Sequence, residues 1–294
     1  MGNVRTFFIN WALARKHGWD IVLRIEDLDT PRVKPGVIDQ TIETLAWIGL
    51  DWDSGPIIQS NDLPNHHAAM VQLASSRRVY PCSLSRTQIQ LASNAPNEGD
   101  HEIRFDPALR PSEIPHAFTD KQTNWRFVVT DDPIHFEDRF LGSQSFCPAH
   151  TVGDFVVWTQ RRCPSYQLAV VVDDHHQSIT QIIRGNDLLD STARQIQLWD
   201  ALDFGPLPHY THLPLVRGAD GRRLAKRHGD TRIEHYRSKG TSREHIIGLI
   251  AYWSGISSTR QPISPSEFLD AFNLDTLPKD DVIFTKEDDQ WLTN

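Results

Sequence analysis

Hydrophobic residues at helical spacing alternate with short apolar runs along the first part of the chain. The spacing of Phe7, Trp11 and Ala14 predicts a helix that opens the chain. The apolar run 21–23 predicts a buried strand, and charged residues follow it directly, from Arg24 onward. Open α/β sheets bind ligands at the carboxyl ends of their strands, so we expect a ligand site there.

The rest of the chain continues this alternation and then becomes helical. Cap and stop signals mark the expected helix ends. These signals are Asn3, Gly18, Gly49, Thr192 with Gln195, Thr241 with Glu244, Ser264 with Glu267, and Thr285. We expect helices over 36–49 and 61–78, strands over 125–129, 152–158, 166–172, 179–184 and 213–216, and helices thereafter.

This order of elements predicts an α/β protein with a Rossmann-like, doubly wound parallel sheet. Prolines, acidic loops and short apolar runs over 79–149 predict an inserted module that lies outside that sheet. We therefore expect a catalytic domain over 1–78 and 150–230, and a helical subdomain over 231–294. A glycine-rich phosphate loop of the dinucleotide or Walker type is absent from the sequence.

Composition narrows the class of protein. The 294 residues are 39% hydrophobic and 23% charged, which is typical of a soluble globular protein. The formal net charge of −8 argues against nonspecific nucleic-acid binding over the whole surface, although a local basic patch remains compatible with RNA. Three cysteines, an odd number, predict reduced thiols, and no apolar run is long enough for a membrane span. We expect a cytoplasmic protein.

Two groups of histidine and aspartate superficially resemble metal sites. His66 and His67 are neighbours on a predicted helix, and such neighbours do not share a face. The run 173–176 follows a predicted strand, and it is interpreted as a polar turn because consecutive side chains diverge. We expect no metal site at either place.

Four segments, in the right order, resemble class I glutamyl-tRNA synthetases, and most closely the short glutamyl-Q tRNA(Asp) synthetases. The resemblance implies activation of glutamate by ATP with Mg²⁺, followed by transfer of the glutamyl group to RNA. The short chain, which lacks the anticodon-binding domain of the longer enzymes, implies transfer to the queuosine base of tRNA(Asp). The segments are 2–5, 24–32, 166–190 and 223–227.

The resemblance also implies where ATP binds. Gly2 and Asn3 would place a helix amino terminus at the phosphates. Lys226 would be the catalytic residue, because its charge would neutralise the departing pyrophosphate; the alternative interpretation is a solvated lysine on a hairpin loop. Ala225 departs from the usual serine of this loop. The implied ATP-binding residues of the loop are Arg223, Leu224, Ala225, Lys226 and Arg227.

Three side chains are implied to hold glutamate. Glu26 would accept from the α-ammonium, and Tyr166 would pack against the substrate and form a hydrogen bond with it. Arg184 would pair with a carboxylate, for which its planar fork is suited. The alternative interpretation is an internal ion pair for Glu26 and Arg184, and a buried aromatic residue for Tyr166.

The zinc site that the family usually carries in the insertion is degraded here. Cys82 is the one retained ligand, and Leu84, Phe105 and Leu109 stand at the other three positions. Three apolar ligand positions are incompatible with tetrahedral zinc. We expect a hydrophobic cluster of these four residues in place of the metal.

The family's first strand and the histidine of its first ATP signature are not present ahead of Gly2. We interpret this as a start codon placed too far downstream. Two alternatives remain: a truncated glutamyl-tRNA synthetase that charges tRNA(Glu), and a non-catalytic synthetase-derived protein that binds RNA or an amino acid. A basic run is the expected RNA contact: Arg222, Arg223, Lys226, Arg227, Arg232, Arg237, Lys239 and Arg243.

Overall fold

A computed structural model describes residues 1–28, 36–92, 103–119, 122–222, 224 and 231–293 of the chain, with side chains omitted for 90–92. Its strands are β1 (Val22–Ile25), β2 (Ser54–Ile58), β3 (Val79–Cys82), β4 (Asn124–Phe127), β5 (Ile134–Asp138), β6 (Gly142–Phe146), β7 (Val156–Trp158), β8 (Gln181–Gly185), β9 (His209–Leu213), β10 (Val216–Arg217) and β11 (Val282–Ile283). Its helices are α1 (Gly2–His17), α2 (Val37–Ile48), α3 (Leu63–Ser75), α4 (Arg86–Ala92), α5 (Pro148–Thr151), α6 (Tyr166–His176), α7 (Leu189–Ala201), α8 (Ile233–Ser238), α9 (Arg243–Trp253), α10 (Pro265–Ala271) and α11 (Lys286–Thr293).

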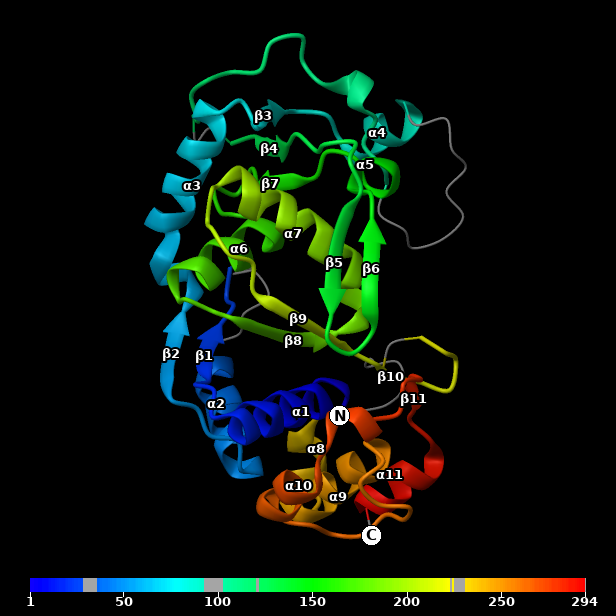
Figure 1. Ribbon diagram of the computed structural model, residues 1–294. Helices are drawn as coiled ribbons and strands as arrows, with labels where there is room; N and C mark the ends of the chain where they lie inside the picture. The colour runs from blue at the N-terminus through cyan, green and yellow to red at the C-terminus, as the bar shows by residue number, and fades with distance from the viewer. Residues whose placement is uncertain (29–35, 93–102, 120–121, 223, 225–230, 294) are drawn as a thin grey trace.

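Helix α1 forms where the hydrophobic spacing predicts it, and it lies between strands β8 and β9 and the C-terminal helices α8 to α11 (Figure 1). Phe8 is fully buried and meets Phe268 of α10 edge to face, with ring centroids 5.4 Å apart. Gly18 ends the helix in the left-handed conformation, with φ of 65°, as its sequence position predicts. The cap at the other end is Met1, so the assignment of Asn3 as the cap is wrong.

The sheet arrangement is mixed α/β with parallel strand pairs, as predicted. Strands β1 and β2 pair in parallel, and β8 pairs in parallel with β9 in the four-stranded order β6-β5-β9-β8. Strand β5 also pairs in parallel with β9, through Asp138 and Tyr210. The hairpin β5–β6 therefore extends this sheet, and the expectation that all of 79–149 lies outside it is wrong for 134–146.

Helix α6 replaces the strand expected over 166–172. Its residues from Leu168 to Asp174 are buried on every side, so the helix carries no amphipathic pattern and its valines resemble a buried strand. The run 173–176 accordingly forms the last turn of α6 and not a polar turn after a strand. The strand expected over 213–216 is displaced as well, because β9 ends at Leu213 and β10 begins at Val216.

Helix caps agree with the sequence in part. Ser264 and Glu267 form the predicted capping box, and Thr285 bonds to the first turn of α11. Thr192 lies inside α7 instead of capping it, because the helix already begins at Leu189. Ser242, one residue beyond the predicted Thr241, caps α9.

The C-terminal helices α8 to α11 gather under α1, at the end of the molecule opposite β3, β4 and β7 (Figure 1). Their apolar side chains join those of α1 in one hydrophobic cluster, which includes Phe8, Leu249 and Phe268. This packing holds the amino terminus of α1 beside the ends of β8 and β10. A cavity opens at that junction.

Candidate functional site

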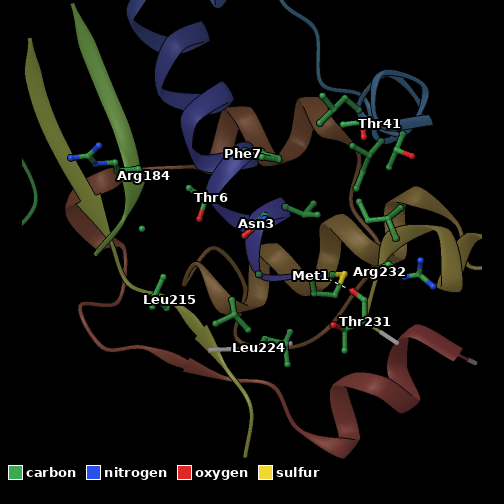
Figure 2. A pocket seen from close by; sticks show the side chains of 18 of the residues that line it. Met1, Asn3, Thr6, Phe7, Thr41, Arg184, Leu215, Leu224, Thr231 and Arg232 are labelled. Carbon is green, nitrogen blue, oxygen red and sulfur yellow. Dashed lines mark hydrogen bonds between the residues drawn. The ribbon is translucent and has the colours of Figure 1, made fainter. Parts of the chain in front are cut away.

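A cavity of about 630 Å³ lies between the amino terminus of α1, the end of β8 and the segment 231–234. Figure 2 shows Asn3, Arg184 and Leu224 around it, contributed by three separate parts of the chain. Gly2 and Glu26 line it as well. The structure thus brings together predicted ATP-binding residues and two of the three predicted glutamate-binding residues.

The α1 end of the cavity has the features of an anion site. The helix is 16 residues long, and its first turn contains no acidic residue. The positive end of the helix dipole favours a phosphate at such a position. The α-amino group of Met1 donates to the backbone oxygen of Thr231 over 2.6 Å, which ties this helix end to the opposite wall.

Glu26 lies in a charged cluster just beyond β1. Its Oε1 is 3.2 Å from Nη2 of Arg24, and Nη1 of Arg24 donates to Oδ1 of Asp174 over 2.8 Å. Asp27, the next residue, accepts hydrogen bonds from both the backbone N–H and the hydroxyl of Ser60. These contacts fix the strand end, and they place Glu26 in an ion pair with Arg24, which is the alternative interpretation of this residue.

Tyr166 and Arg184 meet at the edge of this cluster. Burial raises the pKa of Tyr166 and the positive charge of nearby Arg184 opposes that rise, although 42% of the Tyr166 surface is exposed. The Tyr166 ring itself lines a second cavity of about 670 Å³, together with Arg126 and Arg194. Glu26 and Arg184 therefore share the first cavity, whereas Tyr166 lines the second.

Several buried polar residues that support the site are not among its predicted residues: His66 and Asp173 stand in the two groups rejected as metal sites, and His212 and Asp138 carry no sequence motif. Asp173 of α6 accepts from the Gln59 side chain over 2.6 Å and lies 2.8 Å from Nε2 of His66. His212 and Asp138 lie behind Arg184. Nε2 of His212 is 3.0 Å from Nε of Arg184, and Oδ2 of Asp138 is 2.7 Å from Nδ1 of His212. No sequence signal marks the second pair, because β9 also contains His209 and Thr211 and β5 also contains His135 and Glu137.

Part of the predicted site falls outside the described residues: Arg223, Ala225, Lys226 and Arg227, as well as 29–32. In the basic run, Arg237 bonds to Glu43 and lies over the Trp47 ring, 5.0 Å from its centroid. Arg243 pairs with its neighbour Glu244. The assignment of this run as an RNA contact stays a prediction.

The expected hydrophobic cluster is present in the insertion. Cys82 and Phe105 are buried and belong to one cluster, against which Leu84 and Leu109 pack. Among the described residues, no group of three or more histidine, cysteine, aspartate or glutamate side chains is arranged to hold a metal ion. Within the same part of the chain, no helix is both long and apolar enough to cross a membrane.

Comparison with known proteins gives the family. The model of the tRNA synthetases class I (E and Q), catalytic domain, matches residues 1–291. A Symbiobacterium thermophilum protein named glutamyl-Q tRNA(Asp) synthetase is 40% identical over 295 residues, which cover 96% of this chain and 91% of that protein. Glutamate–tRNA ligase 2 of Syntrophus aciditrophicus is 33% identical, over all of this chain but 63% of its own length.

The fold agrees with this assignment. A crystal structure of glutamate-tRNA synthetase from Elizabethkingia anophelis superposes with a TM-score of 0.78 at 24% identity, over 99% of this chain and 66% of that one. The family match spans nearly the whole chain, and the relative from Symbiobacterium thermophilum exceeds 30% identity over most of its own length. The chain therefore belongs to the class I aminoacyl-tRNA synthetases of the E and Q type, a family of ligases.

Proposed function

We propose that the protein activates glutamate with ATP and transfers the glutamyl group to the queuosine base of tRNA(Asp). The observation that supports glutamate activation is the 630 Å³ cavity, which Gly2 and Asn3 of α1 line together with Glu26 and Arg184. The helix terminus suits the phosphates of ATP, the carboxylate suits the ammonium group of an amino acid, and the guanidinium suits a carboxylate of that amino acid.

Each residue has a role in this reaction. Glu26 accepts hydrogen bonds from the α-ammonium, and Arg184 pairs with a carboxylate of glutamate while Tyr166 packs alongside. The α-carboxylate then attacks the α-phosphorus of ATP, an acyl-adenylate forms and pyrophosphate leaves. Gly2, Asn3 and Leu224 line the nucleotide space. Lys226, with Arg223 and Arg227, neutralises the pyrophosphate, Ala225 lies in the same loop sequence, and Mg²⁺ would supply further charge neutralisation when bound.

The choice of acceptor is supported by the relatives. The match covers 91% of a relative named glutamyl-Q tRNA(Asp) synthetase but 63% of one named glutamate–tRNA ligase 2. On this proposal, residues 1–78 and 150–230 form the catalytic domain, 79–149 bind the acceptor, and 231–294 form the helical subdomain. The second cavity, which Tyr166 and Arg126 line, opens toward strands of 79–149 and is the expected side for RNA.

The acceptor is tested by glutamylation of tRNA(Asp) with and without queuosine, beside tRNA(Glu). The proposal predicts a product on queuosine-containing tRNA(Asp) whose glutamyl label is recovered in the anticodon fragment after ribonuclease digestion, because the terminal ribose is not the acceptor. Labelling of tRNA(Glu) that periodate abolishes would instead identify a truncated glutamyl-tRNA synthetase. A protein that binds RNA or glutamate but catalyses no glutamate-dependent ATP–pyrophosphate exchange would be the non-catalytic alternative.

A further inference from the structure

Arg184 is held from behind by a chain of buried polar groups. Its Nε donates to Nε2 of His212 over 3.0 Å, and its Nη2 donates to Oγ1 of Thr192 over 2.8 Å. His212 Nδ1 lies 2.7 Å from Oδ2 of Asp138. Strand pairing sets this order, because Arg184 of β8 is opposite His212 in β9, and β9 pairs with β5, which ends at Asp138.

The protonation state of His212 follows from its partners. Arginine has no acceptor atom, so Nε2 of His212 must accept the bond from Arg184. The proton of the neutral imidazole is then on Nδ1, which donates it to Asp138. This tautomer suits the site, because a doubly protonated imidazole would direct an N–H and a positive charge at the guanidinium.

Asp138 stabilises the tautomer of His212 that has its proton on Nδ1. Its side chain is fully buried, and it accepts hydrogen bonds from the backbone N–H groups of Phe140, Leu141 and His212. Burial raises the pKa of Asp138, but the bonds from His212 and Leu141 outweigh that effect and leave the pKa below its ordinary value. The group is therefore an ionised carboxylate with a fixed direction.

We infer that His212 and Asp138 are positioning residues for Arg184: they fix one edge of the guanidinium so that the rest of its fork meets the substrate carboxylate. The inference rests on the proposed function, in which Arg184 binds glutamate. A free arginine side chain loses considerable rotamer entropy when it binds a ligand, and a fork that is already fixed loses less. Thr192 adds the second anchor, on Nη2.

The test compares four variants by calorimetric titration with L-glutamate and, separately, with ATP. His212→Leu removes the acceptor, and we expect the Kd for glutamate to rise about tenfold or more, with the Kd for ATP unchanged. His212→Gln restores an acceptor oxygen and should recover part of the affinity. Thr192→Val removes the second anchor and should weaken binding less. Thr211→Ser, a buried neighbour of His212 in β9, is the matched control.

A purely structural role would lower the melting temperature of His212→Leu while the folded protein kept its glutamate Kd. That result would overturn the inference but not the proposed function. If His212→Leu does not fold, Thr192→Val and His212→Gln carry the test, and unchanged glutamate Kd values in both would overturn it. Wild-type protein that does not bind glutamate overturns the proposed function and, with it, the premise of the inference. An ¹⁵N spectrum of His212 with its proton on Nε2 would contradict the assigned tautomer in every case.

Discussion

Arg24 and Asp174 form an ion pair between the end of β1 and the last turns of α6, with Nη1 2.8 Å from Oδ1. Burial raises the pKa of Asp174, and the positive charge of Arg24 opposes that rise. The same guanidinium is 3.2 Å from Glu26, which the proposed function assigns to the substrate ammonium. One arginine therefore forms ion pairs with both Asp174 and Glu26.

Removing this arginine should destabilise the protein. We expect Arg24→Gln to lower the free energy of unfolding by about 3 kcal/mol, because the buried carboxylate of Asp174 loses its partner. The double variant with Asp174→Asn should recover much of that loss, and urea titration measures both. Arg237→Ala, which breaks an exposed pair with Glu43, is the control and should cost less than about 1 kcal/mol. Equal losses for the two arginines would contradict the account.

Acid should weaken the network behind Arg184. Burial lowers the pKa of His212, the bond to Asp138 opposes this effect, and the charge of Arg184 lowers the pKa further. Asp187 also faces the imidazole and raises its pKa, and the Tyr210 ring stacks near it. Because the net pKa in the folded state is depressed, the unfolded state binds the proton more readily, and stability is lost as the pH falls below the ordinary histidine value of about 6.5.

The measurement is urea unfolding at several pH values between about 7.5 and 5. Wild type should lose stability over this range, and His212→Gln, which has no titrating ring, should lose less. The pKa of Asp138 is also depressed, so its contribution disappears only at lower pH, below the ordinary aspartate value of about 3.9. Identical pH slopes for wild type and His212→Gln would show that His212 does not titrate as described.

A glycine at the base of the insertion is sterically required. Gly153 has φ of 64°, and an added Cβ would lie 1.9 Å from the backbone oxygen of Phe105. Gly142 has φ of 75° but no atom within 4 Å of such a Cβ, so it is the matched control. We expect Gly142→Ala to cost about 1 kcal/mol, from the backbone conformation alone, and Gly153→Ala to cost clearly more. Thermal unfolding compares the two, and equal costs would contradict the clash.

The insertion should fold without zinc. Cys82 and Phe105 are buried in an apolar cluster with Leu84 and Leu109 packed against them. Elemental analysis of purified protein should therefore find no stoichiometric zinc, and a chelator should leave the melting temperature unchanged, whereas structural zinc contributes directly to folding. Phe105→Ala should cost about 3–5 kcal/mol, since it opens a cavity in this cluster. Zinc at one equivalent per chain would overturn the prediction.

The sequence predicts the elements whose local signals agree with their environment. α1 ends at Gly18, and α10 begins with the Ser264 capping box, because these signals depend on the backbone close by. The sequence predicts a strand where α6 forms, because burial on all sides removes the helical period and packing overrides the strand preference of its valines. Local pattern cannot anticipate an environment that distant segments create.

The same limit applies to the site. Glu26, Tyr166 and Arg184 could be named from a family resemblance, and the structure places them together. His212 and Asp138 could not be named, because they are 74 residues apart and meet only when β5 and β9 pair in one sheet. Residues that orient a binding group are defined by that tertiary contact and by no spacing along the chain.

The central claim, activation of glutamate, is tested most directly by glutamate-dependent exchange of pyrophosphate into ATP. We predict exchange with glutamate but not with aspartate, and a loss of about 100-fold in kcat/KM for glutamate in Arg184→Gln, which lacks the charged partner of the substrate carboxylate. Wild-type protein that catalyses no exchange above the glutamate-free background, or Arg184→Gln with wild-type exchange, would contradict the account.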